Sequence, residues 1–363
     1  MPMKNTINIG SQMGNYEIKI FSNFSFLADE IAKIWSGERI VVITDKTVGD
    51  LYLEQLSDAL YGIVHEICPI VLPPGEDSQG IETLQSVYRF LLDNNINRSD
   101  LIITLGGGVI GDLGGFAAAT FLRGVSYVQI PTTLLSQIDS SIGGKVAINF
   151  HGIKNVVGAF YNPKLVYINT NVLNTLPDRE YKCGLAEAMV HALIADKDLV
   201  YYIHQNMFNR SIIDDDIIRR FIYRNCEIKA NIVMQDECDN GIRGILNFGH
   251  TFGHALETLF EFKYKHGECV SVGIVSIFKV ALINDFISKD IYDEITKILE
   301  DIGLPVKFDN VNWEKVIDII HFDKKHLSNK IKLILPVGMG KVATHIVSFD
   351  NFKEMVLTRF KEK

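Results

Sequence analysis

Cysteine is scarce in this chain of 363 residues, and the five cysteines that occur are scattered. They are odd in number and none belongs to a C-x-x-C pair, so the sequence predicts neither a disulfide framework nor a cysteine-ligated zinc site. The N-terminus also lacks the apolar segment of a signal peptide. Both absences are typical of a protein from a reducing compartment, and we expect a cytoplasmic protein.

An excess of positive charge and a long apolar run are absent as well. Lys and Arg number 36 against 44 Asp and Glu, which gives a formal net charge of −8. This balance argues against nucleic acid or an acidic membrane surface as a partner. The longest apolar stretch, residues 270–283, is interrupted by Lys279 and has about 14 residues, too few to span a bilayer. We therefore expect no nucleic-acid partner and no membrane association.

The two halves of the sequence differ in their hydrophobic patterns, and the length fits roughly two domains of about 150 residues each. In the first half, Val/Ile-rich runs at residues 39–45, 101–105, 125–131 and 164–170 alternate with helix-periodic segments. Such runs suit strands covered by helices on both faces. We predict an α/β domain with a parallel sheet over residues 1–178 and an all-α domain over residues 179–363. The stretch KIKLILPVG is left open as a short strand. Clefts between domains are favoured binding sites, so the active site is expected in the interdomain cleft.

Residues 106–111 read GGGVIG directly after the predicted strand LIITL. This matches G-x-G-x-x-G, in which glycines let the backbone approach a pyrophosphate at a helix N-terminus. A tight strand–helix turn is the alternative. An ordinary dinucleotide dehydrogenase fits poorly, because the motif begins about a hundred residues into the chain and Thr132 and Thr133 stand near the position of the expected acidic residue. Asp45, at the end of an earlier strand, is the better ribose-binding candidate.

Small and polar residues are dense over residues 130–164. The segment Gly143-Gly144-Lys145 suits wrapping around an anion, with the lysine as a point charge. Asp139 is either a salt-bridge partner or a group that binds a hydroxyl. Further basic residues recur in the helical half, and each is either a surface charge or part of the same site: Lys229, Arg243, Lys324 and Lys325.

Three histidines occur close together in the helical half. His250 and His254 are four residues apart, on one face of a predicted helix, and His266 follows. Neutral imidazoles together with a carboxylate are typical zinc ligands, and Glu187 in the small-residue segment GLAEA is the candidate carboxylate. Few protein ligands leave positions open for a substrate, so the predicted site is catalytic. Spacing alone assigns both His250 and His254 to the metal.

Five motifs together resemble the 3-dehydroquinate synthase family, in order and in spacing, over roughly residues 40–340. They read GGGVIGDLGGFAAATFLRG, IPTTLLSQIDSSIGGKVAIN, KNVVGAFYNP, GIRGILNFGHTFGHALE and HGECVSVG. The resemblance implies a nucleotide-binding N-terminal domain, a metal-binding C-terminal domain and a homodimer. It also implies a lyase reaction of the shikimate pathway, in which the sugar phosphate 3-deoxy-D-arabino-heptulosonate 7-phosphate becomes 3-dehydroquinate and phosphate, with NAD and a zinc or cobalt ion.

The resemblance also implies a role for each matching residue. Glu187, His250 and His266 are implied as metal ligands, which moves His254 from the metal to the substrate phosphate. The residues implied around NAD are Asp45, Gly75, Glu76, Gly108, Val109, Ile110, Gly111, Asp112, Thr132, Thr133, Lys145, Lys154, Val172, Leu173, Asn174 and Thr175. Those implied around the phosphate are Lys145, Asn155, Asn247, His254 and Lys325. The remaining implied roles are the substrate carboxylate for Arg243 and Lys229, a ring hydroxyl for Asp139, and the neighbouring subunit's site for Arg123.

The chain departs from the family pattern at three positions. Val190 stands where the family has a lysine three residues after the metal glutamate, Gln79 replaces the lysine of a G-E-x-x-K motif, and Asp239 replaces a glutamate. The first two departures each remove a positive charge near a ligand. Retention of Arg243 and Lys229 favours a substrate with a carboxylate. The alternatives are a sibling cyclase that acts on another sugar phosphate and a glycerol dehydrogenase-like metal alcohol dehydrogenase.

Overall fold

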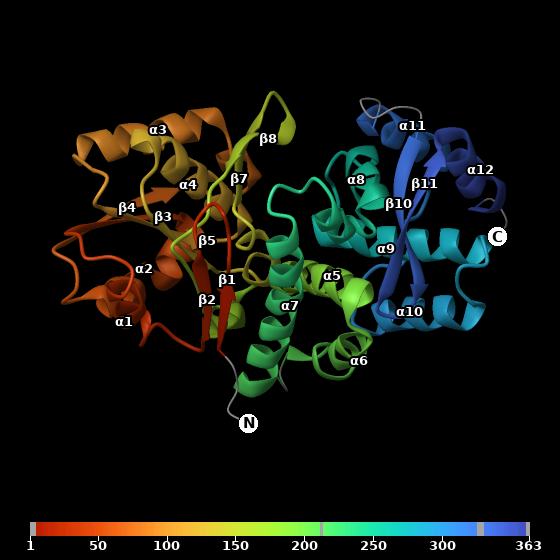
Figure 1. Ribbon diagram of the computed structural model, residues 1–363, viewed down its shortest axis with the longest axis horizontal. Coiled ribbons are helices and arrows are strands. Elements are labelled where there is room, and N and C mark those ends of the chain that lie inside the picture. Colours follow the sequence, from red (N-terminus) through yellow and green to blue (C-terminus); the bar gives the residue numbers. More distant parts are fainter. Residues whose placement is uncertain (1–4, 211–212, 325–329, 361–363) are drawn as a thin grey trace. The chain divides into compact units, whose positions relative to one another are not determined.

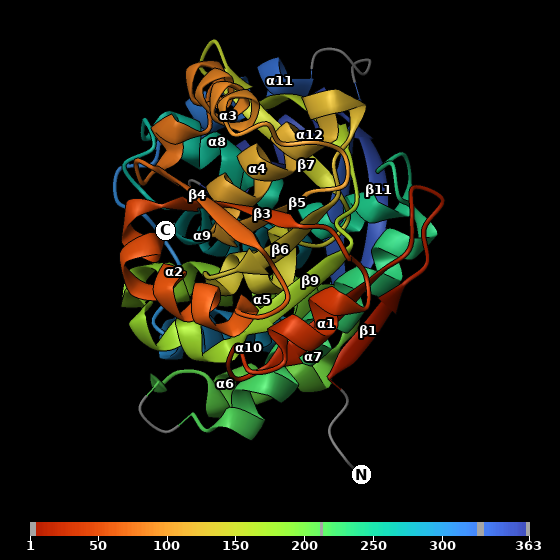
Figure 2. The same ribbon diagram turned by 90° about the vertical axis from the view of Figure 1, so that its left-hand side faces the viewer.

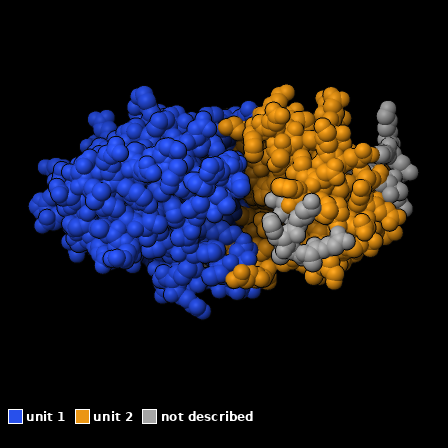
Figure 3. Space-filling view, turned by 90° about the horizontal axis from the view of Figure 1, so that it is seen from above, with its two compact units in different colours: residues 1–181, 215–239 blue, residues 182–214, 240–363 orange. Residues whose placement is uncertain are grey.

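The computed structural model describes residues 5–210, 213–324 and 330–360. Two compact units divide the chain: residues 1–181 with 215–239, and residues 182–214 with 240–363 (Figure 3). The sequence instead predicted two continuous domains that meet after residue 178. The main difference is helix α7 (Asp215–Gln235), which packs on the N-terminal strands of the first unit although it follows them by about 200 residues (Figure 1).

The first unit is built on a seven-stranded sheet with the order β1-β2-β9-β6-β5-β3-β4. Every neighbouring pair is parallel except β1 with β2. The strands are β1 (Thr6–Ile9), β2 (Tyr16–Phe21), β3 (Arg39–Asp45), β4 (Glu66–Leu72), β5 (Leu101–Gly106), β6 (Tyr127–Pro131) and β9 (Leu165–Asn169). The predicted parallel sheet is confirmed, and the four predicted strands correspond to β3, β5, β6 and β9. The separate hairpin of β7 (Lys145–Phe150) and β8 (Ile153–Phe160) lies outside this prediction.

Helices cover both faces of the sheet (Figures 1 and 2). They are α1 (Leu27–Ala32), α2 (Lys46–Leu60), α3 (Ile81–Asp93) and α4 (Gly108–Thr120). Successive residues of a strand point to opposite faces. In β3, Val41 and Ile43 accordingly pack with α3 and α4, whereas Ile40 and Val42 pack with α1 and α2. The uninterrupted apolar runs of the sequence are the strands that this double covering requires.

The second unit is helical. Its helices are α5 (Asp178–Ala195), which begins in the first unit, α6 (Lys197–Asn206), α8 (His250–Leu259), α9 (His266–Ile283), α10 (Lys289–Asp301), α11 (Trp313–Lys324) and α12 (Phe349–Phe360). A hairpin of β10 (Lys330–Gly338) and β11 (Lys341–Ser348) distinguishes it from a purely helical domain. The first strand is the KIKLILPVG stretch, in which the alternating residues Ile331, Leu333 and Leu335 are buried.

The apolar stretch at residues 270–283 belongs to α9. Within the described parts of the chain, α9 is the one helix long and apolar enough to cross a membrane, and 72% of its apolar window is buried inside the protein. A helix that is apolar on all sides and buried is typical of the core of a large protein.

Candidate active site

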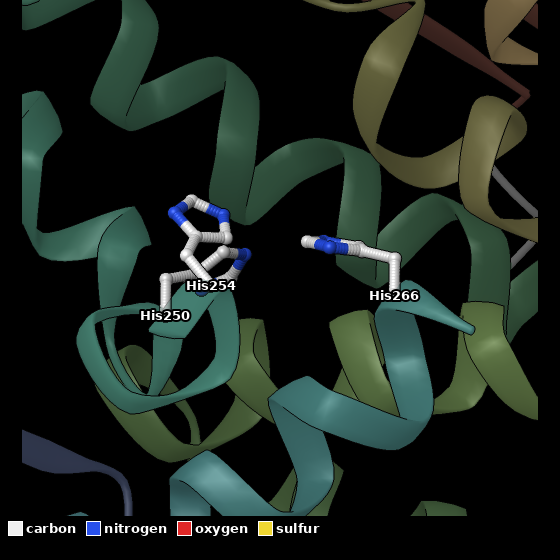
Figure 4. Close-up of side chains that lie close together, drawn as sticks. All are labelled: His250, His254 and His266. Carbon is white, nitrogen blue, oxygen red and sulfur yellow. The ribbon is translucent and has the colours of Figure 1, made fainter. Parts of the chain in front are cut away.

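Four ionisable side chains from three helices meet in the second unit. Glu187 lies on α5, His250 begins α8, His254 lies one turn later, and His266 begins α9. Glu187 Oε1 is 3.2 Å from His250 Nε2 and 3.1 Å from His266 Nε2. The three imidazole rings lie around a common space (Figure 4), and their ligand atoms are within 4.8 Å of one another. The structure brings together all four residues that the sequence singled out for a metal.

Glycines let these three helices approach closely. A Cβ atom at Gly267 would overlap the backbone of Cys183 on α5, and one at Gly273 would overlap the backbone of Gly249, which precedes α8. Gly249 also has a φ of 78°, a left-handed conformation that residues with a side chain rarely adopt. Larger residues at these positions would push α5, α8 and α9 apart and separate the four side chains.

Hydrogen bonds from behind orient two of the histidines. His250 Nδ1 lies 3.1 Å from the Phe248 carbonyl oxygen, and His266 Nδ1 lies 3.3 Å from Glu257 Oε1. Acceptors at Nδ1 hold the ring proton there once a metal occupies Nε2, which is the usual arrangement behind a metal-binding histidine. Sequence reasoning missed Glu257. Its signal is spacing, because it follows His250 by seven residues, two turns along the same face of α8.

Charge in this cluster is balanced between carboxylates and imidazoles. Burial alone would raise the pKa of Glu187, but His250 and His266 lower that pKa below its usual value. Burial alone would lower the pKa of His266, whereas its hydrogen bonds to Glu187 and Glu257 raise that pKa to about 10. Desolvation of the ring nitrogens within the cluster and the neighbouring His250 and His266 rings lower the pKa of His254 to about 4, although the residue keeps an exposed edge. A divalent cation would therefore displace protons from the cluster on binding.

The donor set fits a divalent transition metal. One carboxylate oxygen and two imidazole nitrogens that converge on it are typical of catalytic zinc sites, which keep a coordination position open. His254 lies close enough to be a third imidazole ligand, so distance by itself favours neither the spacing-based assignment nor the family-based one. Exposure distinguishes them, because His254 is exposed whereas Glu187 and His250 are buried.

Apart from Lys154, which lies on β8 of the separate hairpin, the nucleotide-binding candidates in the first unit follow the carboxyl ends of its parallel strands. These candidates are Asp45, Gly75, Glu76, Gly108–Asp112, Thr132, Thr133, Lys154 and Val172–Thr175. Asp45 ends β3, the glycine segment follows β5, Thr132 follows β6, and the 3-10 turn Thr170–Thr175 follows β9. The carboxyl edge is where open parallel sheets bind ligands. Asp45 also caps α2, since its side chain accepts a hydrogen bond from Val48 N at 3.0 Å.

Two lysines that the family resemblance places at the substrate form ion pairs within the first unit. Lys229 on α7 is buried, and its Nζ lies 2.5 Å from Asp139 Oδ1 and 2.7 Å from the Asp139 carbonyl oxygen. Lys145, at the start of β7, pairs with Asp239. Asp139 is thus a salt-bridge partner, one of the two roles that the sequence left open. Asp239, which replaces a family glutamate, keeps a carboxylate beside Lys145.

In the second unit, Arg243 is buried within the 3-10 turn Ile242–Asn247, whose last residue is exposed. The left-handed conformation of Gly249 separates this turn from α8, so Arg243 and His250 do not share one continuous helix. Val190 lies one turn after Glu187 on α5 and has no exposed surface. A lysine at position 190 would therefore have to displace neighbouring apolar side chains to reach a ligand.

Two further candidates lie in the first unit. Asn155 on β8 and Arg123 after α4 are exposed, and both have left-handed backbone conformations, with φ values of 54° and 64°. Lys325 lies outside the described residues.

Two family models match the chain: "3-dehydroquinate synthase N-terminal" over residues 69–183 and "3-dehydroquinate synthase C-terminal" over residues 184–326. The 3-dehydroquinate synthase of Acetivibrio thermocellus is 42% identical over 357 residues, which cover 98% of this chain and 99% of that protein. A 2-deoxy-scyllo-inosose synthase, solved with carbaglucose-6-phosphate, NAD+ and Co2+, has a TM-score of 0.85 at 23% identity and covers 97% and 99% of the two chains. A 2-epi-5-epi-valiolone synthase from Streptomyces hygroscopicus, with NAD+ and Zn2+ bound, has a TM-score of 0.85 at 24% identity and covers 98% and 99%. These two structures share the fold of this chain.

Proposed function

This chain belongs to the 3-dehydroquinate synthase family, and we propose that Glu187, His250 and His266 hold the divalent metal of its active site. Its reaction converts 3-deoxy-D-arabino-heptulosonate 7-phosphate into 3-dehydroquinate and phosphate, which makes it a carbon–oxygen lyase of the shikimate pathway. When bound, zinc or cobalt supplies Lewis-acid polarisation and NAD supplies reversible acceptance of a hydride. The observation that carries the assignment is Glu187 Oε1, which lies 3.1 and 3.2 Å from two imidazole Nε2 atoms.

The chain's own cationic groups bind the anionic groups of the substrate. Arg243 and Lys229 hold the carboxylate of the substrate. Asp139 accepts a hydrogen bond from a ring hydroxyl, and Lys229 fixes the orientation of the Asp139 carboxylate. The residues that hold the phosphate are Lys145, Asn155, Asn247, His254 and Lys325. Hydrogen bonds from charged donors to a dianionic phosphate are stronger than neutral ones, which suits the stabilisation of a departing phosphate. The pairing of Lys229 with Asp139 at 2.5 Å supports this arrangement.

NAD lies along the carboxyl edge of the parallel sheet. The N-terminus of α4, at residues 108–112, receives the pyrophosphate, and Asp45 binds the ribose. Tyr52 supports the neighbouring turn, because its hydroxyl donates to the Val172 carbonyl oxygen at 3.2 Å and contacts Thr175. The placement of these segments after four adjacent strands supports the assignment.

The protein acts as a cytoplasmic homodimer in which Arg123 reaches the active site of the partner subunit. An exposed arginine in a left-handed turn beside the exposed Leu122 supports this role. Arg123→Ala is expected to lower kcat/KM while light scattering still gives the mass of a dimer. A monomeric wild-type protein would contradict it.

Sequence relatives favour this reaction over the alternatives. Proteins named 3-dehydroquinate synthase are 41% and 42% identical over nearly the whole chain, whereas the sibling cyclases are 23% and 24% identical. The direct test is to incubate the purified protein with the heptulosonate phosphate, zinc and NAD far below the substrate concentration. We expect 3-dehydroquinate and phosphate in equal amounts, no accumulation of NADH, and loss of turnover on exhaustive chelation. NADH that accumulates with product would indicate a simple dehydrogenase instead.

A further inference from the structure

Gln79 is buried at the centre of a hydrogen-bond network in the first unit, with 3% of its surface exposed. Its Nε2 atom lies 2.8 Å from Asn155 Oδ1, 3.2 Å from Asp112 Oδ2 and 3.2 Å from the Ala147 carbonyl oxygen. These three acceptors belong to β8, α4 and β7. The backbone carbonyl oxygen of Gln79 accepts a hydrogen bond from Asn149 N at 2.7 Å. One side chain therefore connects three elements that carry nucleotide and phosphate candidates.

The acceptors fix which way the Gln79 amide faces. The Ala147 carbonyl oxygen can only accept a hydrogen bond, so the NH2 group of Gln79, and not its oxygen, must point toward it. The same NH2 group then donates to Asn155 Oδ1. A glutamine delivers this donation without the positive charge of the lysine that the family resemblance leads one to expect here.

This donation in turn fixes the amide of Asn155. Its oxygen is engaged by Gln79, and its backbone N–H donates to Asn149 Oδ1 at 2.9 Å, which anchors the residue in its left-handed conformation. The two ends of a side-chain amide point in different directions, so the Nδ2 group is turned away from Gln79. Within residues 5–210, 213–324 and 330–360, no hydrogen bond from Asn155 Nδ2 to a protein group is present. Asn155 is exposed, so this donor is available to a ligand.

We propose that Gln79 is a positioning residue that holds the Asn155 amide so that it presents N–H donors, not its oxygen, to the phosphate of the substrate. The proposal rests on the proposed function in taking phosphate as the ligand of Asn155. A phosphate oxygen is an acceptor, and an amide oxygen turned toward it would repel it. Loss of the correct orientation of the Asn155 amide is therefore expected to weaken phosphate binding as much as loss of the side chain itself.

Substitutions at position 79 separate this role from packing. Gln79→Met has a similar length and no donor, so it releases the Asn155 amide to rotate. Gln79→Lys retains a donor and is the rescue variant. Gln129→Met is the matched control, since Gln129 is also 3% exposed in the first unit and its Nε2 faces Tyr127, outside the Asn155 network.

The measurement is the dissociation constant of inorganic phosphate, by calorimetry on the zinc- and NAD-loaded protein, with thermal unfolding as a check of folding. We expect Gln79→Met and Asn155→Ala each to weaken phosphate binding by about tenfold, as for a hydrogen bond to a charged group. The double variant is expected to lose no more than either single variant, because both remove the same interaction. Gln79→Lys and Gln129→Met should stay within about threefold of wild type.

Several outcomes overturn the proposal. Phosphate binding of Gln79→Met equal to wild type would do so, and so would losses that add fully in the double variant. A protein that makes 3-dehydroquinate normally but whose phosphate affinity is insensitive to Asn155→Ala would leave the proposed function standing and remove this inference. A wild-type protein that releases no phosphate from the heptulosonate phosphate would instead contradict the proposed function itself.

Discussion

Two carboxyl groups, Asp112 in the first unit and Glu187 in the second, are both buried, yet their pKa values are shifted in opposite directions. Burial raises the pKa of Asp112 on α4 to about 7, although the hydrogen bond from the Gln79 amide acts in the opposite direction. Burial acts in the same direction on Glu187, but the imidazoles of His250 and His266 reverse it and lower its pKa. The partner of each carboxyl group, a neutral amide or a chargeable ring, decides its charge state.

The comparison explains what each unit is built to hold. In the second unit, Glu187 stays ionised and offers its lone pairs to a cation. In the first unit, Asp112 exchanges its proton near pH 7, and it lies one turn into α4, whose first residues we place at the NAD pyrophosphate. A neutral carboxyl group there adds less repulsion to a dinucleotide than a carboxylate would.

The largest effect is expected from removing the charge in the second unit. Glu187→Gln retains the shape of the side chain but loses the anionic ligand. We expect bound zinc to fall well below one per chain and kcat/KM to fall by about a thousandfold, about 4 kcal/mol. Glu268→Gln at the start of α9 is the control, since Glu268 caps that helix through Lys265 N at 2.8 Å. Full zinc content and wild-type activity in Glu187→Gln would remove Glu187 from the metal.

A smaller loss is expected at an exposed cation of the first unit. Lys145 is 52% exposed and pairs with Asp239. Lys145→Ala should lower kcat/KM by about thirtyfold, about 2 kcal/mol, the low end for a charge that binds an anion, because solvent screens it. Lys289→Ala removes a similar exposed ion pair, with Asp293 on α10, at residues outside the candidate site, and should leave kcat/KM unchanged. Steady-state kinetics of both variants decide whether Lys145 binds the phosphate.

Glu257 provides a test of how much orientation contributes to the metal site. Glu257→Gln still accepts a hydrogen bond from His266 but lacks the charge that raises the basicity of the ring. We expect the zinc affinity to fall by about tenfold with the stoichiometry unchanged, as is usual for a partner behind a metal ligand. Competition with a chromophoric chelator measures this directly. An unchanged affinity would reduce Glu257 to a packing residue.

The smallest effect should be seen in the pH dependence of NAD binding. Because the pKa of Asp112 is raised to about 7, its proton is held below that pH and lost above it, so NAD affinity should fall as pH rises from about 6 to 8. Glu76, Asp139 and Lys229 also face this carboxyl group. The change is expected to be up to about fivefold, about 1 kcal/mol. Gln79→Lys should keep Asp112 ionised and flatten the profile, as should Asp112→Asn. A wild-type profile that is flat would contradict the protonated state.

The sequence could predict those elements whose pattern depends on burial. The strands β3, β5, β6 and β9 are continuous apolar runs because helices cover both their faces. The hairpin β7–β8 escaped prediction because β8 is exposed along most of its length and carries no such pattern. The position of α7 also escaped prediction, because its contacts, such as Lys229 with Asp139, join residues 90 positions apart.

The candidate site shows the same division. Spacing was enough to gather His250, His254 and His266, and the need for a carboxylate pointed to Glu187 in the small-residue segment GLAEA. Neither could show that Glu257 lies behind His266, since that depends on the orientation of a ring. In the sequence, Gln79 indicates only the loss of the positive charge of the family lysine. The structure shows that its amide nitrogen lies within hydrogen-bond distance of three acceptors.

The most direct test of the account is a crystal structure of the zinc-loaded protein, with anomalous diffraction recorded at the zinc absorption edge. We predict one strong peak per chain, about 2.1 Å from a Glu187 oxygen and from Nε2 of His250 and His266, with the His254 ring not bound to it. A peak ligated by His254 in place of Glu187, or the absence of a peak at this cluster in a protein that contains zinc, would contradict the account.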